Sequence, residues 1–189
     1  MYRWNYRLDD HFLGAHMLIS LIIIILSIIL DQLTKYLAST NIILNAPNIT
    51  VIPELLELSY FQNTGMSFGL LEGQMLLFSI FTIIALGIFG YLLLDTNYKT
   101  KKVYSISIAL FIAGTLGNAI DRMVLGYVID FMHFPFLDGI LDLIGLSNFY
   151  NNLADMYLSA AIVLFAIDLF IFDEKRKKEK KKNEENLQS

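Results

Sequence analysis

Four long apolar stretches constrain this chain more than any other feature of its sequence. They run over about residues 17–36, 75–94, 103–123 and 152–172. Each is close to the roughly 20 residues that a helix needs to cross a bilayer. An isolated strand in lipid would leave its backbone groups unpaired, whereas a helix pairs them internally. We therefore predict an all-α membrane protein with four transmembrane helices.

The composition excludes several other classes of protein. Apolar residues make up 56% of the 189 residues and charged residues 17%, against about 45–50% and 25% in an average soluble domain. Such a chain is neither a soluble globular domain nor disordered, because disorder requires low hydrophobicity. The absence of cysteine excludes a disulfide scaffold, a thiolate metal site, a cysteine nucleophile and a lipid anchor on a cysteine of this chain.

The basic residues predict the orientation in the membrane. Twelve of the fourteen Lys and Arg residues lie before the first apolar stretch, between the second and third, or after the fourth, and the connections 37–74 and 124–151 contain none. Because basic loops stay in the cytoplasm, we expect both termini to be cytoplasmic and the two long loops to face outward. The first stretch is expected to be a retained helix, since its apolar run continues to Leu30 without a cleavage pattern.

The four predicted helices and the segments on either side of them divide the chain into three parts. Residues 1–16 form a cytoplasmic extension, residues 17–172 the membrane domain, and residues 173–189 a charged cytoplasmic tail. The tail mixes seven basic with five acidic residues, and we expect it to be solvated and disordered, with contact to anionic lipid as the alternative.

The two outer loops carry different patterns. In loop 37–74, the segments NIILN, ITVIP and LLELSYF combine β-branched and aromatic residues between Asn and Pro, which predicts short strands and hence a β-rich outer loop. In loop 124–151, apolar residues recur at helical spacing, at Leu137, Ile140, Leu141 and Ile144. That spacing predicts a short interfacial helix.

Polar residues from three predicted helices fall at one depth, near the outer edge of the hydrocarbon. At 1.5 Å per residue, Asp31 lies about 21 Å along the first helix, and Asn118 and Asp121 lie about 22–27 Å along the third. The same level includes four more residues, Arg122, Asp130, Asn152 and Asp155. Ionisable residues within membranes are costly and usually functional, so this level is the candidate site.

Simpler interpretations of the same residues stay open. Asp31 and Lys35 are spaced i, i+4 and suit a local ion pair. Asn152 and Asp155 suit the cap of the fourth helix. Asp168 lies near the cytoplasmic end and Lys175, where a structural role is expected. Asp121 and Arg122 could anchor a helix end at the head groups.

The chemistry that these residue types favour is hydrolysis by paired carboxylates. The serines of the first outer loop, Ser59 and Ser67, have only His133 as a candidate base, so nucleophilic catalysis is weakly supported. His133 has no His or Cys at ligand spacing, so no metal is assigned. Two Asp side chains brought close share a proton, and that sharing lets aspartic proteases hydrolyse peptides without a metal.

Four motifs resemble the signatures of one family, lipoprotein signal peptidase (signal peptidase II). They are DQLTK at 31–35, NTGMSFGLL at 63–71, GNAIDRMVLGYVIDF at 117–131 and NNLAD at 151–155. They resemble the family motifs D-x-x-T-K, N-x-G-x-x-F/W, GN-x-x-DR…V-x-D-F and N-x-A-D, in the family order. Two departures are a long stretch at 133–150, and Met66 and Ser67 where small residues are common.

The resemblance implies a role for each matched residue. Asp130 and Asp155 would be the catalytic pair. Asn118, Asp121 and Arg122 would orient it, and Asn63 and Asn152 would contact the substrate. Asp31 and Lys35 would support the site from the first helix. Gly65 would allow a tight loop, and Gly117 a close approach of helices.

The resemblance also implies a reaction and its setting. An aspartic endopeptidase of this family removes signal peptides from diacylglyceryl-modified bacterial prolipoproteins, cutting just before the lipidated cysteine. It would work as a monomer in the cytoplasmic (inner) membrane, near the outer face, with membrane lipid around it and without cofactor or nucleic acid. The first outer loop would form the family's small β-rich platform outside the membrane.

Two other hypotheses use the same aspartates. One is a proton-coupled transporter or channel subunit that relays protons, which the lack of an inverted repeat disfavours. The other is a non-enzymatic assembly or lipid-binding factor, in which the aspartates are caps and anchors.

Overall fold

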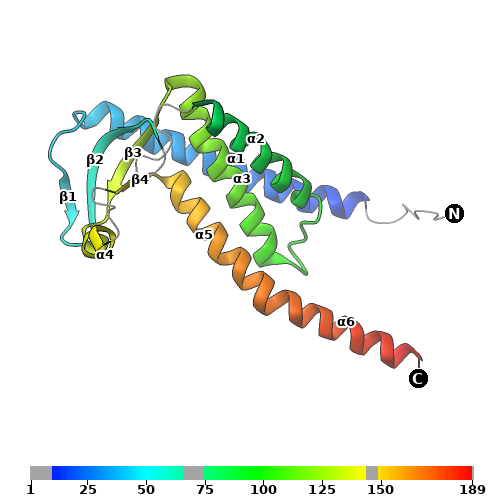
Figure 1. The fold of residues 1–189 in the computed structure, drawn as a ribbon. Helices are drawn as coiled ribbons and strands as arrows, with labels where there is room; N and C mark the ends of the chain where they lie inside the picture. Colours follow the sequence, from blue (N-terminus) through cyan, green and yellow to red (C-terminus); the bar gives the residue numbers. More distant parts are fainter. Residues whose placement is uncertain (1–9, 66–74, 144–148, 189) are drawn as a thin grey trace.

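A computed structural model describes residues 10–65, 75–143 and 149–188 of the chain, as a helical bundle with a small sheet at one end (Figure 1). The start of α1 and the end of α6 lie at the end of the bundle away from the sheet. The elements in chain order are α1 (Asp10–Asn41), β1 (Ile49–Ile52), β2 (Leu56–Asn63), α2 (Met75–Leu93), α3 (Lys102–Leu125), β3 (Val128–His133), the 3-10 turn η1 (Pro135–Leu137), α4 (Asp138–Leu143), β4 (Tyr150–Asn151), α5 (Leu153–Ile167), the π-helical turn η2 (Asp168–Phe172) and α6 (Asp173–Gln188).

Four of the described helical segments are long and apolar enough to cross a membrane, as predicted. The first differs from its predicted limits of 17–36, because α1 already begins at Asp10 and ends at Asn41. In its last turn, polar side chains bond back to the carbonyls of the same helix. Thr40 Oγ1 donates to Tyr36 O at 2.9 Å, and Asn41 Nδ2 donates to Leu37 O at 2.8 Å. The predicted extension 1–16 is therefore partly helical.

The tail differs from the sequence prediction as well. A disordered segment was predicted after residue 172, but α5 continues through η2 into α6 as one long rod. Glu and Lys are good helix formers, and charge pairs along the surface support the helix. Lys177 Nζ, for example, lies 2.7 Å from Asp173 Oδ2, one turn earlier.

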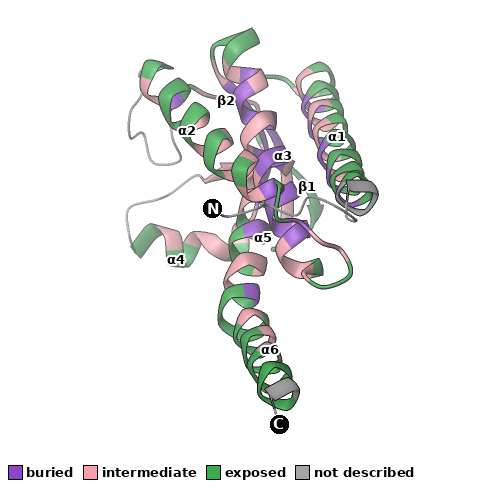
Figure 2. Cartoon of the chain, turned by 90° about the vertical axis from the view of Figure 1, so that its right-hand side faces the viewer, coloured by how far each residue is buried: buried purple, intermediate pink, exposed green. Residues whose placement is uncertain are grey.

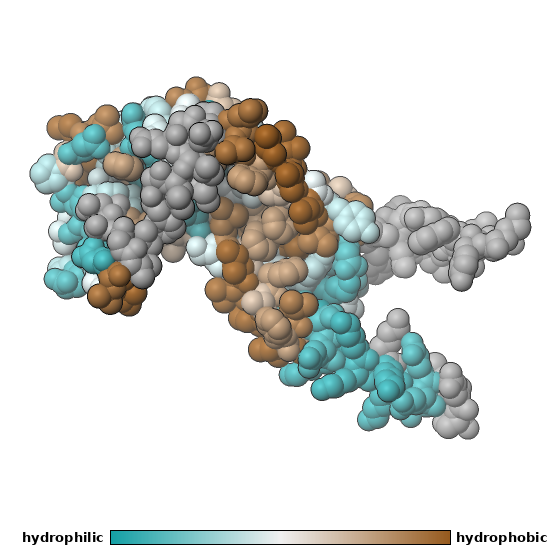
Figure 3. Space-filling view, in the orientation of Figure 1, coloured by the Kyte–Doolittle hydropathy of each residue, from teal (hydrophilic) through white to brown (hydrophobic). Residues whose placement is uncertain are grey.

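Helix α3 is the centre of the bundle. It packs against α1, α2 and α5, and Figure 2 shows buried residues concentrated along it. The outward faces of the other helices carry exposed large apolar side chains. These form a continuous hydrophobic belt between the more polar sheet end and the hydrophilic α6 (Figure 3). This is the surface distribution of a multi-pass membrane protein.

Two glycines allow α3 to approach its neighbours closely. A Cβ atom at Gly114 would lie 2.6 Å from Ala154 O, and one at Gly117 would lie 2.7 Å from Asp31 Oδ2. Any larger residue would push α3 away from α5 or α1. The close approach expected at Gly117 is therefore found, and Gly114 adds a second contact of the same kind that the sequence analysis did not identify.

The sheet is antiparallel, in the order β1-β2-β3-β4. The predicted strands at ITVIP and LLELSYF are present as β1 and β2, whereas NIILN is not a strand. Strand β3 was not predicted, because its residues are all buried and show no alternation. The short interfacial helix is present as η1 and α4, and Ile144 lies outside the described residues.

A tight turn between α3 and β3 brings the end of the helix beside the strand. Gly126 ends α3 with φ 84°, a left-handed conformation that favours glycine, and its N–H donates to Arg122 O. Strand β3 then pairs with β2, with Phe61 opposite Asp130. The turn and this register place Asp130 beside α3 and next to the beginning of α5.

The glycine contact yields the first prediction. Gly114→Ala adds a methyl group against Ala154 O and Leu158, and overpacking of this kind costs about 1–3 kcal/mol. We expect a lower thermal unfolding midpoint in detergent. Gly87→Ala is the matched control in α2, because a Cβ there meets nothing within 4 Å. Equal midpoints for the two variants would contradict the close packing of α3 and α5.

Candidate active site

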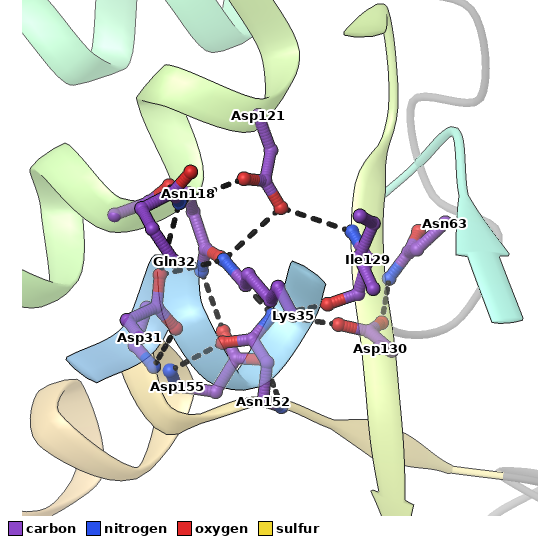
Figure 4. A network of polar contacts seen from close by, with 12 residues as sticks. Asp31, Gln32, Lys35, Asn63, Asn118, Asp121, Ile129, Asp130, Asn152 and Asp155 are labelled. Carbon is purple, nitrogen blue, oxygen red and sulfur yellow. Dashed lines mark hydrogen bonds and ion pairs between the residues drawn. The ribbon is translucent and has the colours of Figure 1, made fainter. Parts of the chain in front are cut away.

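Asp130 and Asp155 lie 25 positions apart in the chain but line one cavity, and Figure 4 shows the network of polar contacts around them. Asp130 comes from the buried strand β3, and Asp155 from the first turn of α5. The cavity has a volume of about 340 Å³. Its remaining walls come mainly from α2, α3 and α5, at Phe78, Phe81, Thr82, Ala85, Gly114, Thr115, Asn118, Arg122 and Leu158.

Asn152 connects the two carboxylates. It is the N-cap of α5, and its Oδ1 accepts from Asp155 N at 3.0 Å while its own N–H donates to Asp155 Oδ2 at 3.2 Å. Its Nδ2 donates to Asp130 Oδ1 at 2.7 Å. The helix cap predicted for these residues is therefore present, and the same side chain also holds the second aspartate.

Two further asparagines complete the contacts of the pair. Asn63 Nδ2, at the end of β2, donates to Asp130 Oδ2 at 2.9 Å. Asn118 Nδ2, from α3, donates to Asp155 Oδ1 at 2.7 Å. Each of the four carboxylate oxygens thus accepts a hydrogen bond from a side-chain amide or backbone N–H. Such bonds fix the rotation of a carboxylate without adding charge.

The positions of Asn63 and Asn152 differ from the shared role that the resemblance implied for them. Asn63 lines the cavity, where it can meet a bound molecule. Asn152 is fully buried and is not part of the cavity wall, and its amide bonds only to protein groups: Asp130, Asn118 Oδ1 and Ile129 O. This placement gives Asn152 an orienting role, and substrate contact is open only to Asn63.

Lys35 lies at the centre of a second set of contacts, which Asn118 connects to the carboxylate pair. Its Nζ lies 2.9 Å from Asp31 Oδ2, 3.1 Å from Asp121 Oδ2 and 3.0 Å from Asn118 Oδ1. The side chain is 1% exposed. The local ion pair of Asp31 and Lys35 is therefore real, but Lys35 also joins α1 to α3.

The two acidic partners of Lys35 each hold a different piece of backbone. Asp31 Oδ1 accepts from Ala154 N at 2.9 Å, so α1 supplies part of the cap of α5. Asp121 Oδ2 accepts from Ile129 N at 3.0 Å, directly before Asp130. Asp121 is buried and bonds to protein groups, so the interpretation in which it anchors a helix end at the head groups does not fit it.

Arg122 and Gly65 approach the pair from the open side of the cavity. The Arg122 guanidinium lies 4.3 Å from the centre of the Phe78 ring, and its Nη2 donates to Gly65 O at 3.4 Å. Gly65 N in turn donates to Asn63 Oδ1 at 3.0 Å. Together they orient the Asn63 amide toward Asp130. The remaining residues of that motif, 66–71, lie outside the described residues.

Sequence reasoning missed Gln32. Its Nε2 donates to Asp121 Oδ1 at 2.8 Å and reaches Gly117 O and Asp31 Oδ2, each at 3.2 Å. The available signal was its place beside Asp31 in the polar cluster DQLTK, but an uncharged amide does not stand out in a search for ionisable groups.

The other polar residues have structural partners. Asp168 pairs with Arg176, at 2.7 Å and 3.0 Å, and not with the neighbouring Lys175. His133 lies between Glu57 and Asp138, at 3.1 Å and 3.0 Å. Among the described residues, no group of three or more His, Cys, Asp or Glu is arranged to hold a metal ion.

Burial perturbs Asp130 strongly. Loss of solvation and the nearby charge of Asp155 raise the pKa of Asp130 to about 7, against the opposing effects of the Asn63 and Asn152 amides and of Lys35. A carboxyl group that keeps its proton near neutral pH, beside a second carboxyl group, can donate that proton while its neighbour accepts one.

A multi-pass membrane protein in which two aspartates line one cavity has the features of the class of membrane-embedded aspartic peptidases. The sequence comparisons give the family. The profile described as "Signal peptidase (SPase) II" matches residues 23–171. This chain belongs to the signal peptidase II family, and it is therefore an enzyme of the aspartic peptidase type.

Individual relatives agree with this assignment. The lipoprotein signal peptidase of Enterococcus faecalis (strain ATCC 700802 / V583) is 39% identical over 157 residues, covering 80% of this chain and 87% of its own. That of Latilactobacillus sakei subsp. sakei (strain 23K) is 37% identical and covers 82% and 95%. A solved bacterial membrane enzyme matches with a TM-score of 0.66 and 31% identity, covering 80% of this chain and 92% of that one. The transporter and assembly-factor hypotheses do not agree with this family.

The raised pKa of Asp130 predicts a measurable titration. The unfolded chain releases this proton near pH 3.8 and the folded protein near pH 7, so the stability contributed by protonated Asp130 is complete at low pH and is lost as the pH rises through that window. Infrared spectroscopy of the purified protein should show a protonated carboxyl group that titrates near pH 7. The signal should disappear in Asp130→Asn and persist in Asp142→Asn, an exposed site on α4. A midpoint below pH 5 would contradict the prediction.

Proposed function

We propose that this protein is the peptidase that removes signal peptides from diacylglyceryl-modified bacterial prolipoproteins, with Asp130 and Asp155 as its catalytic pair. The observation that carries the proposal is the meeting of these two carboxyl groups at one cavity, each oriented by amide donors. Family membership supports the reaction class, and the names of the relatives support a lipoprotein substrate.

The proposed setting is the bacterial cytoplasmic membrane, with both termini inside and the sheet outside. The distribution of basic residues supports this orientation, as does the position of the sheet opposite the lysine-rich α6. The pair then lies at the outer edge of the bilayer. A substrate whose signal helix spans the lipid, and whose acyl chains lie in the outer leaflet, presents its scissile bond at this level.

The arrangement supports a division of roles within the pair. Asp130 holds the shared proton, because burial favours its neutral form. Asp155 lies in the first turn of α5, where the helix dipole favours a negative charge, and both of its oxygens accept hydrogen bonds. Asp155 is therefore the base and Asp130 the acid.

Hydrolysis then proceeds in two steps. Asp155 takes a proton from water as the water oxygen bonds to the scissile carbonyl carbon, and Asp130 gives its proton to the carbonyl oxygen. The resulting gem-diol collapses when its carbon–nitrogen bond breaks. The amine of the lipidated cysteine leaves with a proton from Asp155, a hydroxyl proton returns to Asp130, and the signal peptide carries the new carboxyl group.

The cavity supports recognition of a lipidated chain. Apolar walls from α2 and α5 extend from the aspartates along the membrane, at Phe78, Phe81, Ala85 and Leu158. Among the wall residues, Asn63 and Arg122 have donors that can meet the substrate backbone. The enzyme is proposed to act as a monomer and without a cofactor.

The reaction is tested with a synthetic prolipoprotein peptide that carries or lacks diacylglycerol on its cysteine. We expect the purified protein to cut the modified peptide immediately before the cysteine, as identified by mass spectrometry. The unmodified peptide should be cut at least about tenfold more slowly, since apolar burial of the acyl chains contributes about 0.8 kcal/mol per CH₂ group. Equal rates on both peptides would reject recognition of the lipid.

The catalytic pair is tested by isosteric substitution. Asp130→Asn should lower kcat by on the order of 10³-fold, because acid–base groups contribute about 10²–10⁴-fold, and Asp155→Asn should do the same. Asp155→Asn also disturbs the cap of α5, so Asp130→Asn is the decisive variant. Its unfolding midpoint shows whether it is folded, and Asp142→Asn should retain full activity. Normal turnover by a folded Asp130→Asn protein would reject the pair.

A further inference from the structure

Gln32 connects the two carboxylates that neutralise Lys35. Its Nε2 lies 2.8 Å from Asp121 Oδ1 and 3.2 Å from Asp31 Oδ2. Both acids also pair with Lys35, one turn further along α1. The amide is thus the only uncharged donor that these two acids share in the described part of the chain.

Asp121 carries the effect of Gln32 to the catalytic strand. One oxygen, Oδ1, bonds to Gln32, while Oδ2 accepts from Ile129 N at 3.0 Å and from Lys35 at 3.1 Å. Without Gln32, Oδ1 would lose its donor and the carboxylate would be held through Oδ2 alone, so its rotation about the terminal bond would be less restricted. Rotation would lengthen the bond to Ile129.

Both polar groups of the Ile129 backbone form hydrogen bonds with side chains. Its N–H donates to Asp121, and its carbonyl oxygen accepts from Asn152 Nδ2 at 3.3 Å. The next residue is Asp130. A shift of Ile129 would therefore move the Asp130 carboxyl group relative to Asp155.

The packing around Gln32, Asp121 and Ile129 is incomplete on one side. A second cavity, also of about 340 Å³, lies between α1, α3 and β3 and is bordered by Gln32, Asp121 and Ile129. Its outer residues include Tyr36 and Val124, which are exposed. On the side of this cavity, hydrogen bonds therefore contribute more than packing to the position of the Asp121 carboxylate and the Ile129 peptide.

We propose that Gln32 is a positioning residue for the hydrolysis, which fixes Asp121 so that the Ile129 peptide holds Asp130 against the catalytic cavity. The proposal rests on the function proposed above. Gln32 touches neither aspartate of the pair and lies outside the catalytic cavity wall. It should therefore affect the chemical step and leave substrate binding unchanged.

Two substitutions at Gln32 separate its amide from its volume. Gln32→Met keeps the length of the side chain but removes the donor. We expect kcat to fall by about 10-fold to 100-fold, because a misplacement of about 1 Å costs up to about 10²-fold, while KM stays within about threefold. Gln32→Glu is isosteric but adds a third carboxylate beside Asp31 and Asp121, and it should lower kcat further.

The test measures kcat, KM and the thermal midpoint of the full chain in detergent, with the diacylglyceryl-modified peptide. The variants are Gln32→Met, Gln32→Glu, Asp121→Asn and the double variant Gln32→Met/Asp121→Asn. Thr40→Val is the control on α1, because the Thr40 hydroxyl donates to carbonyls of its own helix and accepts from the adjacent Asn41 Nδ2, so its contacts stay within α1. If Gln32 acts through Asp121, the double variant is no slower than Asp121→Asn alone.

Multiplied losses in the double variant, an unchanged kcat in Gln32→Met, or a loss confined to KM would each overturn the proposal. If Asp121→Asn does not fold, the proposal is judged by Gln32→Met alone: it requires a lower kcat with KM within about threefold. Asp130→Asn separates the two claims. An inactive Asp130→Asn with a normal Gln32→Met rejects only the role of Gln32, whereas an active Asp130→Asn rejects the catalytic pair itself.

Discussion

The rest of the site depends on one buried cation, Lys35. A lone ammonium group at this depth would be very costly, and its burial is tolerated because three oxygens surround it: Asp31, Asp121 and Asn118. Removal of one partner from a buried ion pair is far more costly than the pair itself is stabilising. The contacts of Lys35 therefore force α1 and α3 into one relative position.

With α1 and α3 in that position, a different acidic partner of Lys35 positions each carboxyl group of the pair. Asp31 caps the backbone of α5 and so places Asp155, while Asp121 holds the Ile129 peptide and so places Asp130. The final orientation is left to uncharged amides, from Asn63, Asn118 and Asn152. Amides suit this task because a further cation would lower the pKa of Asp130.

The simple and the functional interpretations of the polar residues are compatible. Asn152 and Asp155 form an ordinary helix cap, and Asp31 and Lys35 form an ordinary i, i+4 pair. Each also has a second partner on another helix or strand. The helix-cap pattern and the i, i+4 spacing therefore identified these residues correctly. They missed the contacts with other elements, because each considers only contacts within one helix.

The sequence by itself determined the four long apolar helices and the family, and it predicted the depth of the polar residues and the aspartate pair, whose two members line one cavity in the structure. The length of the apolar stretches requires helices in lipid, and the rise of a helix gives the expected depth of each polar residue. The motifs then indicate which aspartates form the pair. It did not determine β3, the helical tail or Gln32. Strand β3 is buried on both faces and has no alternation, and Gln32 is uncharged. Only the tertiary structure decided which oxygen meets which donor, because residues 32, 121 and 129 become neighbours through the turn at Gly126 and the close approach of α3 to α1.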